Sequence, residues 1–102
     1  MDEGRPGDVD RRGLEPAAVD YAEHRIDEFE RQYEYDGFTR PIDLEEWVDW
    51  NSAADATGAE AARLASRYRI PKDRAMHVIR KALWAVDIDR VNAVFAAKPG
   101  VP

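Results

Sequence analysis

The sequence predicts an all-α protein, a small bundle of four to five short helices that contains a helix-turn-helix-like hairpin. Apolar residues recur every three or four positions along most of the chain, which is the period of an α-helix. No alternating apolar pattern extends beyond a few residues, so no β-strand is expected. We therefore expect a single helical domain over residues 14–97, with a disordered N-terminal tail at 1–13 and a flexible tail at 98–102.

The first helix is predicted over residues 16–35, because Pro16 suits a first helical turn and Glu15 lies beside its positive end. Its apolar stripe, which also includes Ala22, can pack into the core or pair with a second copy of the chain to form a homodimer. The stripe residues that we consider as partner contacts are Val19, Ile26, Phe29 and Tyr33.

A turn is predicted at 35–41, where Asp-Gly is followed by proline, and a second helix over 43–50. Asp43 and Glu46 have the spacing of a capping box at its start. The segment combines acidic residues with Trp47 and Trp50. Burial of Trp47 with partial cover of Trp50 is the interpretation that we favour, and an acidic, aromatic docking surface for another protein is the alternative.

The helix-turn-helix-like hairpin is predicted over 57–86, after a break at 51–55, with a short terminal helix over 88–97. Thr57 and Glu60 have the spacing of a second capping box. The second helix of the hairpin begins at Pro71 or Lys72 and has the most regular apolar period in the chain. Trp84 falls opposite its apolar stripe, and we expect the terminal helix to cover it. The stripe consists of Ala75, Val78, Ile79, Ala82, Leu83 and Val86.

Residues 64–83 read "LASRYRIPKDRAMHVIRKAL", with small and aliphatic residues where two crossing helices meet and a tight turn between them. The pattern is carried by Leu64, Ala65, Tyr68, Ile70, Ala75, Val78 and Ile79. It resembles the helix-turn-helix of GntR-type winged-helix regulators, and this resemblance implies binding to duplex DNA. The chain departs from that pattern at three positions: Arg69 replaces the turn glycine, Pro71 the capping serine and Arg74 a threonine.

The charge divides unevenly along the chain. Residues 1–60 contain 18 acidic and 6 basic side chains, whereas residues 61–102 contain 3 acidic and 9 basic ones. A basic helix with an arginine-rich turn suits the phosphates and base edges of DNA, and we expect Lys72, Arg74 and Lys81 to neutralise phosphates. Met76, His77 and Arg80 are expected near base edges. The complete predicted nucleic-acid-binding set is Arg67, Arg69, Lys72, Arg74, Met76, His77, Arg80 and Lys81.

The leading hypothesis is a small DNA-binding regulator, of the kind used by phages, mobile elements or antitoxin operons, which acts by occupying an operator. A dimer would bind two half-sites about one helical turn apart. The alternative function is an acidic protein-binding module, an inhibitor, adaptor or nucleic-acid mimic, that acts through the acidic N-terminal half with Trp47 and Trp50. Under either alternative, the basic face can be a solvated surface or can rest on the acidic half of the same chain.

Several classes of function and location are not supported by the sequence. The chain has no cysteine and two histidines, and no catalytic motif accompanies its carboxylates, so we predict no enzyme activity, no cofactor and no metal site. Asp20, His24 and Glu28 share one helix face, but no second ligand set is evident. No apolar run reaches the ~18 residues of a membrane span. The N-terminus lacks the apolar core of a signal peptide, and we expect a cytoplasmic protein.

Overall fold

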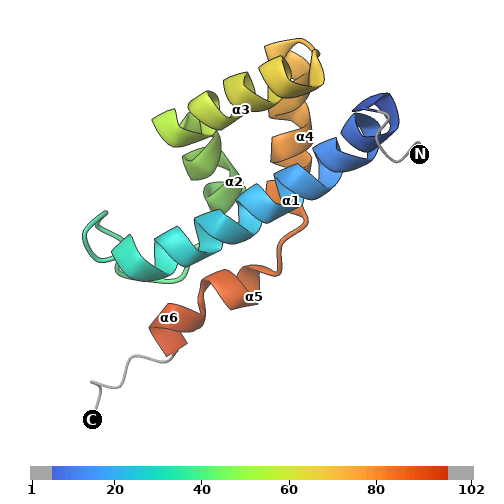
Figure 1. Cartoon of the computed structure of the whole chain (residues 1–102). Coiled ribbons are helices and arrows are strands. Elements are labelled where there is room, and N and C mark those ends of the chain that lie inside the picture. The colour runs from blue at the N-terminus through green and yellow to red at the C-terminus, as the bar shows by residue number, and fades with distance from the viewer. Residues whose placement is uncertain (1–5, 97–102) are drawn as a thin grey trace.

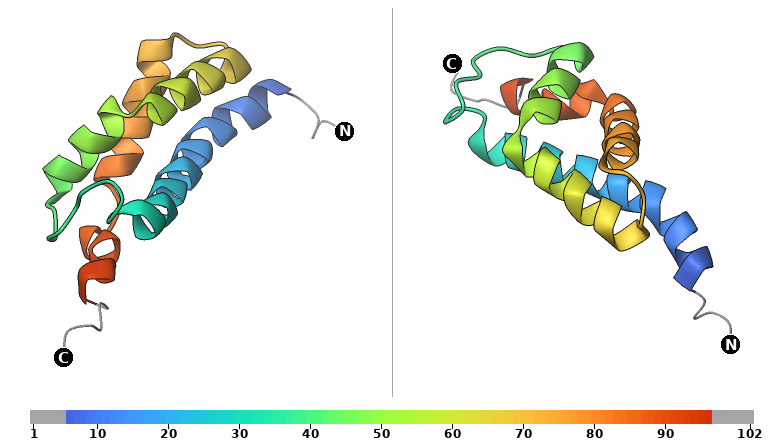
Figure 2. Two further views of the ribbon diagram at one scale, coloured as in Figure 1. Left: turned by 90° about the vertical axis from the view of Figure 1, so that its left-hand side faces the viewer. Right: turned by 90° about the horizontal axis from the view of Figure 1, so that it is seen from above.

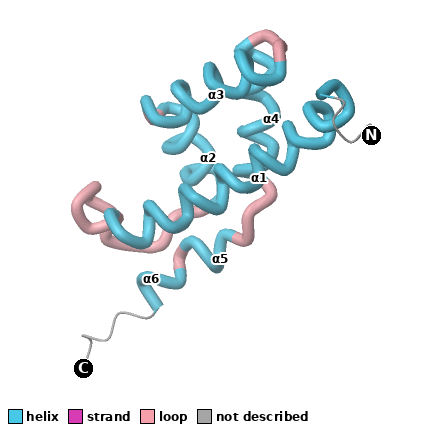
Figure 3. Tube along the Cα trace, viewed as in Figure 1, coloured by secondary structure: helices cyan, strands magenta, loops and turns pink. Residues whose placement is uncertain are grey.

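The computed structural model describes the backbone of residues 6–96 and the side chains of residues 13–96. This part of the chain consists of helices and turns and contains no β-strand, which confirms the all-α prediction (Figure 1, Figure 3). The helices are α1 (Pro6–Gln32), α2 (Leu44–Ala53), α3 (Asp55–Tyr68), α4 (Lys72–Trp84), α5 (Ile88–Val91) and α6 (Ala93–Ala96). None of them combines the length and the apolar character that a membrane span requires.

Helix α1 begins at Pro6, ten residues before the predicted start at Pro16, and Pro16 lies inside it. Pro16 lacks an N–H and removes one backbone hydrogen bond, but the helix continues through it because the preceding turn is packed. Leu14 packs against the core, and a Cβ placed on Gly13 would lie 2.8 Å from the hydroxyl of Tyr68. Residues 6–13, which the sequence assigns to a disordered tail, form part of α1, and residues 1–5 lie outside the described part.

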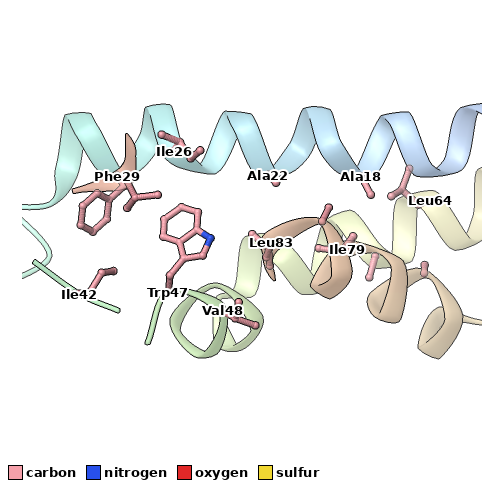
Figure 4. Packing of buried hydrophobic residues seen from close by; sticks show 14 residues of the cluster. Ala18, Ala22, Ile26, Phe29, Ile42, Trp47, Val48, Leu64, Ile79 and Leu83 are labelled. Atoms are coloured by element: carbon pink, nitrogen blue, oxygen red, sulfur yellow. The ribbon is translucent and has the colours of Figure 1, made fainter. Parts of the chain in front are cut away.

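The buried face of α1 differs from the predicted stripe by one position at its N-terminal end. Ala18 is fully buried whereas Val19 is 49% exposed, so the stripe runs through two alanines before it reaches larger side chains. Small residues allow α3 and α4 to approach the first half of α1 closely, and larger residues fill the second half. Figure 4 shows this face opposite Trp47, Val48, Leu64, Ile79 and Leu83.

Helix α2 begins as the sequence predicted. Asp43 accepts a 2.8 Å hydrogen bond from the N–H of Glu46, and the Glu46 carboxylate accepts a 3.0 Å bond from the N–H of Asp43. Before it, Gly37 adopts a φ of 93°, which a residue with a side chain rarely adopts, and closes the predicted turn. The helix continues to Ala53, so the predicted break at 51–55 is reduced to Ala54.

The second predicted capping box is absent. Helix α3 begins at Asp55, two residues before Thr57, and no side chain caps it. Thr57 lies inside the helix, fully buried, and its Oγ1 lies 2.8 Å from the hydroxyl of Tyr21 on α1. The T-x-x-E spacing was misleading because a threonine hydroxyl can bond equally well to a neighbouring helix.

Helix α4 is the central helix of the bundle, and it begins at Lys72 as predicted. It packs against α1, α3 and α2, and the views of Figure 2 show it lying among these three helices. Its buried residues are Ala75, Ile79, Ala82 and Leu83, which belong to the predicted stripe. Because three neighbours surround α4, only one side of it stays open to solvent.

The predicted terminal helix over 88–97 is divided at Asn92 into α5 and α6. The side chain of Asn92 accepts a 3.0 Å bond from the N–H of Ile42 and donates a 2.8 Å bond to its carbonyl. Residues 97–102, which include the predicted tail at 98–102, lie outside the described part. Helix α5 packs on α1, and Trp84 remains 43% exposed. The expectation that this segment covers Trp84 is therefore wrong.

Candidate nucleic-acid interface

The turn between α3 and α4 has the tight geometry that the sequence predicted. Arg69 adopts the left-handed conformation (φ 58°, ψ 51°), and the N–H of Ile70 donates a 3.0 Å bond to the carbonyl of Ala65. Glycine is the usual residue in this helix-ending conformation because a Cβ strains it. Pro71 follows as the N-cap of α4, without a side-chain cap. The two helices leave this turn in different directions (Figure 1).

The open side of α4 carries Arg74, His77 and Lys81, at intervals of three and four residues. All three line one groove between α4 and α1, with a volume of about 500 Å³. Its apolar lining comes from Val19, Val78 and Ala82, and Glu15 lies on its α1 side. The structure therefore brings these three predicted site residues together.

We define the basic surface as the exposed set Arg67, Arg69, Lys72, Arg74, His77 and Lys81. The first three lie around the turn, and the last three lie along the open side of α4. Arg67 lies over the ring of Tyr68, 5.5 Å from its centroid. Within residues 13–96, no carboxylate pairs with a cation of this surface.

The other arginines of the described part all have polar partners. Arg25 and Arg80 donate to the side chains of Asn51 and Ser52. Four more form ion pairs with carboxylates, namely Arg31 with Glu28, Arg40 with Glu46, Arg63 with Glu60 and Arg90 with Glu23. The hydrogen bonds that Arg63 donates to the Glu60 carboxylate raise the pKa of Arg63, so this side chain is committed to its own helix. Unpaired cations are therefore concentrated at the hairpin.

Two predicted base-reading residues do not belong to the basic surface. Arg80 is half-buried, and its Nη1 donates a 2.9 Å bond to Ser52 Oγ on α2. Met76 is also half-buried and packs against the hydrophobic core. Both face the side of α4 that α2 and α3 cover, which a helical wheel of α4 alone cannot reveal. Both are therefore less accessible than His77, which is exposed as predicted, and their assignment as base contacts stays a prediction.

Three of the six predicted partner-binding residues lie in the core. Phe29 and Trp47 are fully buried and Ile26 is 5% exposed, so none of them offers a surface. Trp50 and Tyr33 are half-buried beside Phe29, with ring centroids 6.0 and 5.9 Å away. This cluster also contains Phe38 and Phe95. The assignments of Ile26, Phe29 and Trp47 as partner contacts are wrong, and Val19 contributes to the groove beside α4 instead.

The candidate metal triplet does not assemble. His24 Nε2 lies 3.7 Å from Glu28 Oε2, and no group of three or more histidine or acidic side chains that could hold a metal ion occurs among the described residues. Sequence reasoning also missed the groove residues Glu15 and Val78 as site candidates. An apolar stripe of α1 drawn through Ala18 instead of Val19 would have placed Val19 in the groove beside α4.

Comparisons with protein-family models, curated proteins and solved structures found no match to this chain. The resemblance of the hairpin to GntR-type regulators therefore stays a prediction.

Proposed function

We propose that the chain binds duplex DNA through the basic surface and acts as a small regulator by occupying its site, without chemistry. One observation carries this proposal, the concentration of unpaired cations at the hairpin, while every other described arginine has a partner. A basic face that only balanced the acidic half of the chain would be expected to pair with those carboxylates. Cations that stay unpaired are free to neutralise phosphates, the main source of affinity for DNA.

The backbone of the hairpin adds support. Helix α4 begins at Lys72, and its N-cap residue Pro71 provides no side-chain cap. An uncapped helix start presents N–H groups that can bind a phosphate. Arg69 retains a conformation that suits glycine, and residues with backbone strain of this kind cluster at functional sites. In this proposal, Arg69 and Lys72 contact phosphates at the turn, and Arg74, His77 and Lys81 face the groove of the duplex.

The experiment is a titration of labelled mixed-sequence duplex followed by fluorescence anisotropy, from low to physiological salt. Five neutralised phosphates give a slope of log affinity against log salt of about −4.5. Arg74→Glu/Lys81→Glu should abolish binding. The matched control is Arg31→Glu/Arg40→Glu, which makes the same change in net charge at cations that already pair with Glu28 and Glu46.

Equal affinity of the two double variants would contradict the proposal, since it would show that only net charge matters. Absence of binding by the unmodified chain at low salt would also contradict it. That second result would favour the alternative function, in which the acidic side chains of α1 and α2 bind a basic protein. The remaining aromatic contribution to such a surface is Trp50, because Trp47 is buried.

A further inference from the structure

Trp84 is the most exposed tryptophan of the chain. It ends α4 with 43% of its surface accessible, whereas Trp47 is fully buried and Trp50 half-buried. Burying a tryptophan side chain stabilises a protein more than burying almost any other, so an exposed one forgoes a large gain. The segment that follows leaves α4 and packs on α1, and Trp84 keeps this exposure.

Trp84 continues the open side of α4 on which the basic surface lies. It follows Lys81 by three residues, His77 by seven and Arg74 by ten, so these side chains share one face. At a rise of 1.5 Å per residue, the span from Arg74 to Trp84 is about 15 Å. About four stacked nucleotides, 3.4 Å apart, cover that length. The one carboxylate of α4, on Asp73, lies at the opposite end of the helix.

We propose that Trp84 is a stacking site for an unpaired base of a DNA strand whose phosphates lie on the basic surface. This proposal rests on the proposed function and adds to it a preference for DNA that contains unpaired bases. An indole ring can stack on any base, and proteins that hold single strands combine such rings with a positively charged track. A base pair inside a duplex is stacked on both faces, so its bases cannot receive the ring until they leave the helix. The expected ligand is therefore duplex DNA that continues into a short single strand.

The surroundings of Trp84 favour a nucleic acid over a protein as its partner. A tryptophan that anchors a protein interface lies at the centre of a desolvated patch, ringed by other contacts that exclude water. At the three- and four-residue spacing at which helix side chains meet, the neighbours of Trp84 on α4 are instead Lys81 and Arg80, both charged. Charge complementarity thus selects an anionic ligand with a planar ring, which describes a nucleotide strand.

The test compares three labelled DNAs, namely a blunt duplex, the same duplex with a four-thymidine overhang, and the same duplex with a four-residue abasic overhang. The last two carry equal numbers of phosphates and differ only in their bases. Stacking predicts that the unmodified chain binds the thymidine overhang about ten-fold more tightly than the abasic one. Trp84→Ala should remove this difference without changing affinity for the blunt duplex, and Trp84→Phe should retain part of it.

Tyr35→Ala is the matched control, because it deletes another exposed aromatic, 91% accessible, in the turn after α1. Circular dichroism and thermal unfolding verify that each variant folds. Equal binding of both overhangs by the unmodified chain would overturn the stacking site and leave the duplex proposal standing. A preference for thymidine that survives in Trp84→Ala would also overturn it. No binding to any of the three DNAs would overturn both proposals.

Discussion

Nε of Arg25 on α1 donates a 2.7 Å hydrogen bond to Oδ1 of Asn51 on α2, a side chain that is fully buried. The other end of this amide, Nδ2, donates to the carbonyl of Trp47 at 2.9 Å. A buried amide with both ends satisfied holds its neighbours in one relative position, because any slip leaves a polar group without a partner. This contact therefore fixes α2 against α1, beside the aromatic cluster.

We expect Asn51→Ala to lower the free energy of unfolding by about 2–3 kcal/mol. The variant leaves Arg25 and the carbonyl of Trp47 without their partner, and hydrogen bonds to charged groups are among the stronger ones. Urea unfolding followed by circular dichroism measures the change. Ser52→Ala is the control, because it removes the half-buried partner of Arg80 and should cost about 1 kcal/mol or less. Equal losses in both variants would contradict this account of Asn51.

The indole N–H of Trp47 has no hydrogen-bond partner, although the side chain is fully buried. Replacement by phenylalanine removes this unsatisfied donor and keeps a ring against Phe29. The free energy gained by removing the donor therefore offsets much of the free energy lost with the smaller side chain. We expect Trp47→Phe to cost less than about 1.5 kcal/mol and Trp47→Ala about 3–5 kcal/mol. Urea unfolding of both variants, followed by far-ultraviolet circular dichroism, tests the difference. A loss above about 3 kcal/mol in the phenylalanine variant would mean that the N–H is satisfied in solution.

The periodicity of the sequence predicted the helices more reliably than their ends or their rotation. Ala75, Ile79 and Leu83 follow a regular period and are buried as expected. Val19 was wrongly placed in the stripe because it is the more apolar neighbour of Ala18, yet close packing in the first half of α1 requires the smaller side chain. The start of α1 was misplaced because proline favours the first helical turn, whereas Pro16 lies inside this helix.

The candidate site was predicted in part. A helical wheel places Arg80 opposite the stripe, but it contains no information about α2, whose Ser52 receives that side chain. For Arg69, by contrast, the sequence did indicate the local feature that the structure shows. The sequence places Arg69 where the resemblance expects the turn glycine, and in the structure Arg69 adopts a positive φ, as a glycine there would. Local chemistry can thus be predicted from the sequence, whereas the exposure of a charged side chain depends on which helix packs beside it.

The capping box of α2 makes a small part of the stability depend on pH. Hydrogen bonds from the backbone of Asp43 and from Arg40 hold the pKa of Glu46 below its ordinary value of 4.5. Because the folded pKa is the lower one, Glu46 stabilises the fold above the ordinary value and loses this effect as pH falls through the folded pKa. We expect Glu46→Gln to have a lower Tm than the unmodified chain at neutral pH. The difference in Tm between the two should become smaller below about pH 4. A gap that stays constant with pH would contradict this account.

Arg69 allows stability and binding to be separated in a single substitution. Arg69→Gly relieves a left-handed residue with a side chain, and we expect it to raise the free energy of unfolding by about 1 kcal/mol. The same change removes one cation of the basic surface. It should therefore weaken duplex binding about five-fold at physiological salt and reduce the salt slope by about 0.9. Urea unfolding and anisotropy titration of the same preparation measure both effects.

Gly58→Ala supplies the control for this comparison. Gly58 lies inside α3 with nothing within 4 Å of an added Cβ, so alanine should stabilise the helix by about 0.5–1 kcal/mol. It removes no charge, and DNA affinity should stay unchanged. If Arg69→Gly gained stability and kept full affinity as Gly58→Ala does, Arg69 would have no part in binding. If Arg69→Gly alone gained stability and lost affinity for DNA, Arg69 would be a residue that strains the turn and contributes to DNA binding.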